Sequence, residues 1–322
     1  MQSPESLSPN TTSTLLDLIN VSEAQLVAAG VSFGHGTTNA RDEAIWLVLW
    51  SLGLALDTPL DDPLENPKSM ANRPVAQAEY AKVASILGAR IETRKPAAYL
   101  TQEAWLQGIS FYVDERVIVP RSLIAELLVD GGFDYWLQES THKVLDLCTG
   151  NGSLAIIAAM EFPEVSVVGS DLSVDALAVA RINIDKHHLQ DRIQLLASDG
   201  LNAPELQSAG PFDLILCNPP YVNAQSMATL PREYMAEPFM ALDGNHAGGC
   251  DGMDFVRVLL NETPTHLESS GVLVLEIGNE RAHFEAAFPH LEVVWLETSA
   301  GDDQVLLVTR EALLRAKTPV SA

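Results

Sequence analysis

The segment KVLDLCTGNGS, residues 143–153, joins an apolar run to a glycine-rich loop. The apolar run has the length of a buried strand and ends directly before the loop. Apolar residues over 154–160 then predict a helix. Gly150 and Gly152 allow the loop backbone to approach a ligand closely, although a tight turn without a ligand would use the same residues. The segment therefore predicts the first strand–loop–helix unit of an α/β sheet.

Strand and helix patterns continue to alternate through the rest of the chain. Alternation of this kind predicts a parallel, doubly wound sheet with helices on both faces. In such sheets ligands bind beyond the carboxyl ends of the strands, near the point where the strand order changes direction. The further strands are expected at residues 165–171, 193–197, 212–217, 271–277, 291–296 and 305–308, and a further helix at 174–187.

Acidic residues stand at the ends of the second and third predicted strands. Asp171 ends the second strand, where a carboxylate accepts hydrogen bonds from ribose hydroxyls. Ser173 is better placed than Asp171 to cap the following helix. Asp199 follows the third strand and suits an adenine amino group, with Gly200 beside the ring, although Asp-Gly is also a common turn sequence. These residues suit either a dinucleotide or S-adenosylmethionine.

The fourth predicted strand ends at a rigid corner, Asn218-Pro219-Pro220-Tyr221. Two consecutive prolines fix φ and have no N–H groups, so they cannot continue a strand. The Asn218 side-chain oxygen and a carbonyl of the proline pair can each accept one N–H of a planar amide or amine. Tyr221 can stack on the same planar group. The corner therefore predicts methyl transfer to a planar nitrogen, and the alternative is a rigid turn after a buried strand.

The N-terminal part of the chain differs from the sheet-forming part. Residues 1–13 are rich in Ser, Thr, Pro and Asn and predict a disordered tail. Apolar residues at helical spacing predict a small helical domain over 14–93, whose third helix ends at Gly88. Because this region contains no catalytic constellation, we interpret it as a domain for substrate recognition or support.

A connector is predicted over residues 94–130, before a sheet domain over 131–322. Within the connector, residues 109–113 and 116–119 alternate around a short polar turn and predict a β-hairpin. A helix is expected over 123–129. The connector therefore joins the helical domain to the sheet domain.

The composition limits the possible partners. The net charge of −24 at pH 7 repels nucleic-acid phosphates and attracts basic partners, although it also suits general solubility. No apolar run is long enough to span a bilayer, and the N-terminus does not have the pattern of a signal peptide. The three cysteines have no paired spacing and no metal-ligand pattern. These features favour a cytoplasmic protein with free thiols and without a metal site.

With these motifs, the chain resembles the HemK-type protein-glutamine methyltransferases, which use S-adenosylmethionine to methylate a glutamine side-chain amide. The resemblance covers nearly the whole chain after about Arg94. It implies a Rossmann-like class I S-adenosylmethionine-dependent methyltransferase fold and implies that the Asn-Pro-Pro-Tyr corner holds the glutamine amide. The matching segments are DLCTGNG at 146–152, Asp171, Ser198-Asp199, the corner at 218–221 and YMAEPFMAL at 234–242. The resemblance implies that the residues from Cys148 to Gly152 and Asp171 contact the cofactor. Our full set of predicted cofactor-binding residues is Asp146, Cys148, Thr149, Gly150, Asn151, Gly152, Asp171, Leu172, Ser198, Asp199, Gly200 and Asn218.

Two connector segments favour one branch of this family. PRSLIAELL at 120–128 and YVDERV at 112–117 resemble the PrmB branch, which modifies the third large-subunit (50S) ribosomal protein. The release-factor branch typically reads Pro-Arg-Pro-Glu-Thr-Glu at the first of these segments. The resemblance thus implies a basic ribosomal protein as partner, toward which an acidic enzyme would be steered. The same charge argues against binding to duplex DNA, which depends on Lys and Arg at the phosphates.

Other functions stay open from the residues alone. One is methylation of a glutamine in a peptide chain release factor, and another is methylation of adenine in DNA, which uses a similar Asn-Pro-Pro corner. A non-catalytic scaffold for ribosome assembly would need a damaged donor site, yet Asp146, Gly150, Gly152 and Asp171 are all present. A nicotinamide-dependent oxidoreductase would need a proton-donating group after the fourth strand. The target glutamine and the oligomeric state are left open.

Overall fold

The computed structural model describes residues 13–62, 64–138 and 140–317. The disordered tail predicted for residues 1–13 therefore lies, except for Ser13, outside the described residues. Among the helices of the described chain, none has both the length and the apolar character that crossing a membrane requires.

The chain folds into two compact units. The helical unit comprises Met1–Gln102 and Pro231–Ala236. The sheet unit comprises Glu103–Leu230 and Glu237–Ala322. Residues 94–130, the predicted connector, are therefore divided between the two units. The chain also leaves the sheet unit after Leu230 and returns to it at Glu237, so the helical unit contains residues from two distant parts of the sequence.

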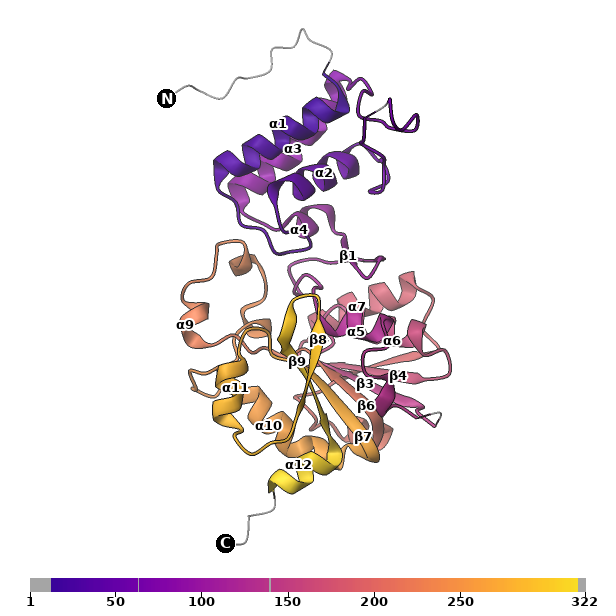
Figure 1. Cartoon of the computed structure of the whole chain (residues 1–322), viewed down its shortest axis with the longest axis vertical. Helices are drawn as coiled ribbons and strands as arrows, with labels where there is room; N and C mark the ends of the chain where they lie inside the picture. Colours follow the sequence, from indigo (N-terminus) through magenta and orange to yellow (C-terminus); the bar gives the residue numbers. More distant parts are fainter. Residues whose placement is uncertain (1–12, 63, 139, 318–322) are drawn as a thin grey trace. The chain divides into compact units, whose positions relative to one another are not determined.

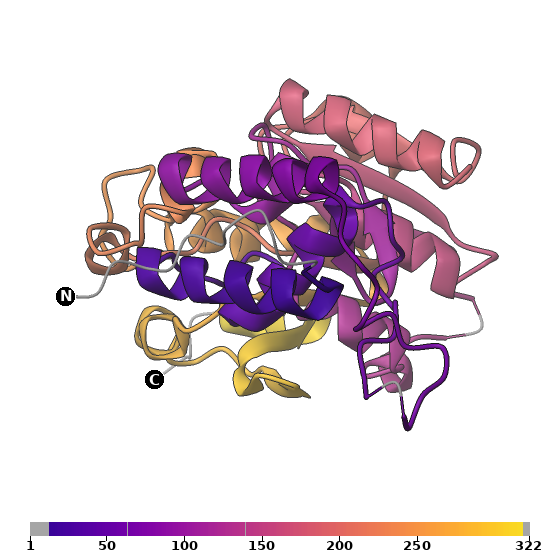
Figure 2. The same cartoon turned by 90° about the horizontal axis from the view of Figure 1, so that it is seen from above.

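The helical unit is built on helices that pack side by side (Figure 1). Its helices are α1 (Leu15–Ala29), α2 (Ala40–Ser51), α3 (Gln77–Thr93), the short α4 (Ala97–Thr101) and the 3-10 turn η2 (Tyr234–Ala236). The Thr14 hydroxyl accepts the Asp17 N–H at 3.2 Å, and the Asp17 carboxylate accepts the Thr14 N–H at 3.0 Å, so the two residues cap the start of α1. Gly30 ends the helix at a φ of 59°. Figure 2 shows α1 and α3 lying side by side.

The third helix extends beyond its predicted end. The sequence predicts that α3 ends at Gly88, because glycine costs about 1 kcal/mol relative to alanine inside a helix. This prediction is wrong, since α3 continues to Thr93. The added turn contains Arg90, which is 1% exposed and donates from Nε to Glu43 Oε1 of α2 at 2.8 Å. The buried ion pair stabilises the turn that follows the glycine.

Over the described residues, seven strands of the sheet unit form one sheet in the order β5-β4-β3-β6-β7-β9-β8. The seven predicted strands are confirmed, with shifts at their ends. Because β3 lies between β4 and β6, the strand order changes direction between β3 and β6, where a ligand crevice is expected. The strands are β3 (Lys143–Leu147), β4 (Ser166–Asp171), β5 (Ile193–Ala197), β6 (Phe212–Cys217), β7 (Leu267–Glu276), β8 (Val294–Thr298) and β9 (Gly301–Thr309).

Helices cover both faces of this sheet (Figure 1). Val144 and Leu214 face α5, α6 and α7, whereas Leu145 and Ile215 face α8, α10, α11 and α12. Neighbouring residues of a strand therefore contribute to two separate apolar cores, as a sheet buried on both faces requires. The helices are α5 (Ile124–Val129), α6 (Ser153–Glu161), α7 (Val174–Lys186), α8 (Pro204–Ala209), α9 (Ala224–Met227), α10 (Asp254–Glu262), α11 (Arg281–Ala287) and α12 (Arg310–Lys317), with 3-10 turns η1 (Asp134–Trp136), η3 (Phe239–Ala241) and η4 (Thr263–Thr265).

The sheet is parallel except at one edge. Strands β3 to β7 pair in parallel, but β9 is antiparallel to both β7 and β8. The prediction of a parallel sheet therefore fails for the last two strands. Only Ser299 and Ala300 separate β8 from β9, and a connection this short can join only antiparallel strands.

The β-hairpin lies earlier than the sequence predicts. β1 (Ala104–Leu106) pairs with β2 (Ile109–Phe111), so the predicted hairpin over 109–119 is wrong. Asn183 of α7 explains why the pairing stops before Tyr112. Its Oδ1 accepts the Tyr112 N–H at 2.7 Å, and its Nδ2 donates to the Tyr112 carbonyl at 2.9 Å. These bonds occupy the backbone groups that a partner strand would need.

We predict that Leu145→Ala lowers the free energy of unfolding of the sheet unit by about 2–5 kcal/mol, because it leaves a cavity beside a fully buried central strand. Urea denaturation followed by tryptophan fluorescence and circular dichroism measures this loss. Leu314→Ala, at a position 41% exposed on α12, is the control and should cost much less. Equal losses for the two variants would contradict the assigned core.

Candidate active site

A cavity of about 660 Å³ lies at the carboxyl ends of the central strands of the sheet unit. It is lined by residues that follow β3, β4, β5 and β6. Leu147 pairs with Cys217, so the loop after β3 and the corner after β6 begin at the same level of the sheet. The cavity therefore occupies the position at which the change in strand order predicts a ligand.

The loop after β3 is supported by Asp146, which is 1% exposed. Asp146 Oδ2 accepts the Thr149 hydroxyl at 2.5 Å and the Ala155 N–H at 2.9 Å. Burial raises the pKa of Asp146 to about 7. Neither Asp146 nor Thr149 lines the cavity. The two residues instead join the end of β3 to the start of α6.

Asn151 and Gly152 also lie outside the cavity lining. The Asn151 carbonyl accepts a hydrogen bond from Asn183 Nδ2 at 2.9 Å. Gly152 has a φ of 81°, and a Cβ atom there would approach the Ala180 Cβ to 3.1 Å. Glycine is required at this position because the loop packs closely against α7 in a left-handed conformation.

Cys148 and Gly150 line the cavity, and a hydrogen bond joins their loop to the end of β4. Both residues are left-handed, with φ values of 62° and 55°. The Gly150 N–H donates to Asp171 Oδ2 at 2.9 Å, and Asp171 Oδ1 accepts the Ser173 N–H at 2.9 Å. Burial raises the pKa of Asp171, although these two hydrogen bonds act in the opposite direction. Asp171 thus has a fixed orientation at the cavity wall.

The remaining predicted cofactor residues, Leu172, Ser198, Asp199 and Gly200, all line the cavity. Leu172 is 57% exposed and presents an apolar side chain. The Ser198 hydroxyl donates to the Gly200 carbonyl at 2.7 Å, which closes the turn that carries Asp199. An apolar surface and a carboxylate therefore lie at the ends of neighbouring strands.

The four residues of the corner after β6 have different surroundings. Asn218 and Pro220 line the cavity, whereas Pro219 is buried. The Asn218 side chain forms no hydrogen bond with any described residue. Tyr221 is not part of the lining. A Cβ atom at Gly278 would approach the Tyr221 ring to 2.7 Å, and burial together with the nearby Glu276 carboxylate raises the pKa of Tyr221. Stacking of Tyr221 on a substrate stays a prediction.

Two segments that were not predicted as site residues also line the cavity. Residues 115–118 follow the hairpin, and residues 238–241 include Phe239 and Met240, which are 66% and 51% exposed. Except for Ile118, both segments lie in the sequences that carry the family resemblance, YVDERV and YMAEPFMAL. That resemblance was the available signal, because neither segment has a pattern of strand, loop and helix that would predict a ligand.

Arg121 and Ser122 of the connector bind two segments of the sheet unit, and the segment after Glu237 continues into the cavity wall. Arg121 donates two hydrogen bonds to the carboxylate of Glu237, at 2.6 and 2.8 Å, and the Val119 N–H donates to the same carboxylate at 2.9 Å. The Ser122 hydroxyl donates to Glu276 Oε2 at 2.6 Å, at the end of β7. Paired, hydrogen-bonded carboxylates of this kind are costly to disturb because removing one partner leaves a buried charge. The connector therefore fixes residues 238–241 beside the sheet.

The cavity wall is acidic. Its carboxylates belong to Glu115, Asp171, Asp175, Asp199 and Asp243. The guanidinium of Arg116 also lines the cavity, but it donates to Asp114 from Nη2 at 2.6 Å and from Nε at 2.9 Å. This ion pair offsets its charge. A cationic ligand is therefore favoured over an anionic one.

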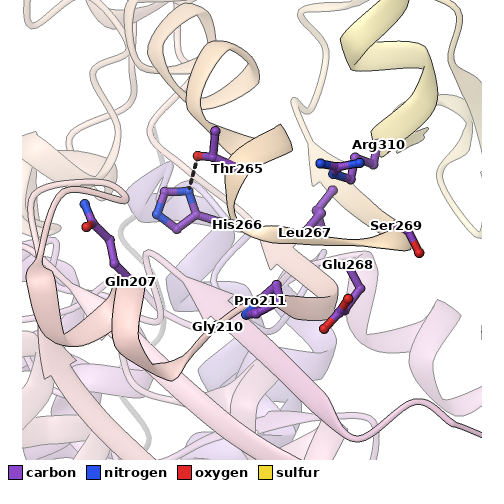
Figure 3. A pocket seen from close by; sticks show the side chains of 9 residues that line it. All are labelled: Gln207, Gly210, Pro211, Thr265, His266, Leu267, Glu268, Ser269 and Arg310. Carbon is purple, nitrogen blue, oxygen red and sulfur yellow. Dashed lines mark hydrogen bonds between the residues drawn. The ribbon is translucent and has the colours of Figure 1, made fainter.

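A second cavity, of about 620 Å³, lies at the opposite ends of the central strands from the first cavity (Figure 3). Its side chains include Gln207, His266 and Arg310, and the His266 ring contacts the Thr265 hydroxyl at 3.1 Å. It is built at the amino ends of β6 and β7 and contains none of the predicted site residues. Ligands of doubly wound sheets bind at the carboxyl ends of the strands.

The sequence of the chain is similar to those of known methyltransferases. Residues 129–241 match the family described as "Methyltransferase small domain". Over 302 residues the chain is 50% identical to the ribosomal protein uL3 glutamine methyltransferase of Bordetella pertussis, covering 93% of this chain and 96% of that protein. It is 51% identical over 307 residues to the protein of the same name from Burkholderia pseudomallei, covering 94% and 96%. A methyltransferase structure from Pyrococcus furiosus is 18% identical, with a TM-score of 0.46, and covers 69% of this chain and 97% of that chain.

We predict that Asp146 makes stability depend on pH. Because its folded-state pKa of about 7 lies above the ordinary value of 3.8, the folded protein keeps this proton up to neutral pH, whereas the unfolded chain releases it near pH 4. The wild type therefore loses stability through this group as the pH rises from about 4 to about 7. Asp146→Asn has no such titration, so its free energy of unfolding relative to the wild type should rise by a few kcal/mol over this range.

Urea denaturation at a series of pH values measures this difference. Asp191→Asn, at an exposed carboxyl, is the matched control and should follow the wild type. A difference between Asp146→Asn and the wild type that does not change with pH would contradict the prediction.

Proposed function

Because the chain belongs to the family of ribosomal protein uL3 glutamine methyltransferases, we propose that it transfers a methyl group from S-adenosylmethionine to the side-chain amide nitrogen of a glutamine in that ribosomal protein. The observation that carries the proposal is that Asn218 and Asp171 line one cavity at the switch point of the sheet. An acceptor for amide N–H groups thereby lies in the same cavity as a carboxylate suited to ribose.

The cavity suits S-adenosylmethionine in size and in chemistry. A volume of about 660 Å³ falls within the range of small-molecule sites. S-adenosylmethionine carries a sulfonium and an ammonium group, and the five carboxylates of the wall favour such a cation. Leu172, Phe239 and Phe255 provide apolar surface for an adenine ring. When bound, S-adenosylmethionine supplies an electrophilic methyl group.

Several wall residues have roles in this proposal. Asp171 would accept hydrogen bonds from ribose hydroxyls, since it ends β4 and its orientation is fixed by the Gly150 and Ser173 N–H groups. Asp199 would accept from the adenine amino group, with Gly200 beside the ring. Asp146, Thr149, Asn151 and Gly152 would act indirectly by holding the loop that contains Gly150.

Asn218 would hold the acceptor amide. The lone pair of a glutamine amide nitrogen is delocalised, so this nitrogen is a poor nucleophile. The Asn218 side-chain oxygen and a carbonyl of the proline pair would each accept one N–H, which orients the nitrogen and stabilises the positive charge that develops on it. Because no residue in the described chain bonds to the Asn218 side chain, its oxygen is available for this purpose.

The distribution of charge supports a basic substrate. The helical unit has 12 acidic and eight basic residues, whereas the sheet unit has 31 acidic and 11 basic residues, a net charge of −20 out of −24. Attraction of a basic ribosomal protein would therefore arise mainly from the catalytic unit. We propose that the helical unit contributes recognition by contact more than by charge. A ribosomal protein substrate also implies a cytoplasmic location.

A labelling experiment tests the substrate. Purified enzyme is incubated with S-adenosylmethionine that carries a stable-isotope label on its methyl group and either unmethylated uL3 or an unmethylated peptide chain release factor, and the label is located by mass spectrometry. We expect label on a glutamine of uL3 and little on the release factor. The reverse result would replace the proposed substrate, and label on neither protein would contradict the proposed activity.

We predict that Asn218→Ala abolishes methyl transfer but leaves S-adenosylmethionine binding within about twofold of the wild type. The variant removes one of the two acceptors that orient the nitrogen, and misplacing a reacting group costs about 100-fold in rate or more. Turnover is measured with uL3, and cofactor binding by calorimetry. Asn261→Ala, on an exposed position of α10, is the matched control and should retain full activity. Activity of Asn218→Ala close to the wild type would refute the role of Asn218.

A further inference from the structure

The acceptor loop, residues 222–243, runs from the Asn-Pro-Pro-Tyr corner to Asp243, which lines the cavity. Its two ends meet, because the Val222 N–H donates to the Leu242 carbonyl at 2.9 Å and the Gly244 N–H donates to the Val222 carbonyl at 3.1 Å. Between these ends the chain leaves the sheet unit, and residues 231–236 form part of the helical unit. The loop that begins at the acceptor corner thus has its middle in the other unit.

A buried carboxylate anchors this middle part. The Glu233 side chain is 3% exposed, and its Oε1 accepts the Ser32 N–H at 3.0 Å. The same oxygen lies 3.4 Å from Arg94 Nη1 and 3.5 Å from Arg90 Nη1. Burial alone would raise the pKa of Glu233, but the Ser32 N–H and the arginines outweigh it and hold the pKa below its ordinary value. Glu233 is therefore a charged, buried residue that joins residues 231–236 to the rest of the helical unit.

The arginines are themselves held in place. Arg90 is 1% exposed and is bound by Glu43 and by the Ser32 carbonyl, the latter at 2.8 Å. Arg94 donates to the Ala29 carbonyl at 2.6 Å and the Gly30 carbonyl at 2.9 Å, at the end of α1. Glu233 thus contacts a network that includes all three main helices. A movement of these helices would be transmitted to residues 231–236.

Both flanks of the loop are anchored within the sheet unit. Asn223 follows the corner, and its Nδ2 donates to Glu280 Oε1 at 2.7 Å. Glu237 begins the segment that lines the cavity, and it is bound by Arg121. The acceptor loop is therefore held at three points, two in the sheet unit and one in the helical unit. Through the anchor in the helical unit, a change in the arrangement of that unit can alter the position of the acceptor loop.

We propose that Glu233 is a positioning residue for methyl transfer: through Arg90 and Arg94, the helical unit sets the arrangement of the loop that begins at the Asn218 corner. The proposal rests on the proposed function for its catalytic consequence. Glu233 acts through the loop and does not contact the reacting atoms.

Glu233→Gln in the full chain tests the proposal. The substitution keeps the size of the side chain but removes the charge that the arginines bind. We expect kcat with uL3 to fall about tenfold or more, because small displacements of a positioned group have large effects on rate. The KM for S-adenosylmethionine should change much less than kcat, since Phe239 is the one residue of the acceptor loop to which the proposed function gives a role in binding the cofactor, and Asp171 and Asp199 lie on other segments. Glu233→Asp, which retains the charge, should recover part of the lost kcat.

Hydrogen–deuterium exchange provides a readout that does not depend on activity. In the wild type, amides of residues 231–236 should exchange as slowly as those of α3, and in Glu233→Gln the whole of 222–243 should exchange faster. Peptides from β3 and β6 should be unchanged. Glu79→Gln is the matched control, because it breaks the 2.5 Å pair with Arg73 in the same unit without contacting the loop.

Two results would overturn the proposal. One is wild-type exchange of residues 231–236 that is fast while α3 is protected. The other is a Glu233→Gln variant with wild-type kcat and wild-type exchange over 222–243. If the wild type methylates no substrate, the proposed function fails, whereas the exchange measurements still test the anchoring of the loop.

Discussion

Parallel pairing of β3 with β6 is the constraint on which the active site depends. The pairing of Leu147 with Cys217 brings Cys148 and Asn218, which follow these residues, to one edge of the sheet. The donor-binding loop and the acceptor corner are separated by about 65 residues of sequence, yet the sheet holds them at a common cavity. Since both faces of these strands are buried under helices, the register is fixed by two apolar cores at once.

Buried acidic side chains connect this sheet to the segments around it. Asp146 accepts hydrogen bonds from the loop after β3, Glu237 is bound by Arg121, and Glu276 is bound by Ser122. In each case one acidic side chain joins a segment of irregular structure to the sheet or to the connector. The acidic residues therefore have two physical effects. Exposed carboxylates produce the long-range field, while a smaller set, each with its own donors, fixes the backbone near the cavity.

The strand pattern and the strand-end motifs were predictable from the sequence, because both depend on local periodicity and on residues with special backbone properties. The cavity residues Gly150, Asp171 and Asn218 were found in this way. The hairpin was misplaced because its end is set by Asn183, about 70 residues away in sequence. The extension of α3 past Gly88 likewise depends on Glu43, in another helix. Contacts between distant residues of this kind leave no periodic pattern in the sequence.

The path of the chain at residues 231–236 also has a consequence for synthesis on the ribosome. Glu43 and Arg90 are translated early, but their partner Glu233 is translated only after β3 to β6. The nascent helical unit therefore lacks the Glu233 carboxylate, which contacts the buried Arg90 and the half-buried Arg94, while most of the sheet is being made. N-terminal domains generally fold first during synthesis. Here the last step of N-terminal folding must wait until residue 236 has left the exit tunnel, which makes the order of domain maturation differ from the order of the sequence.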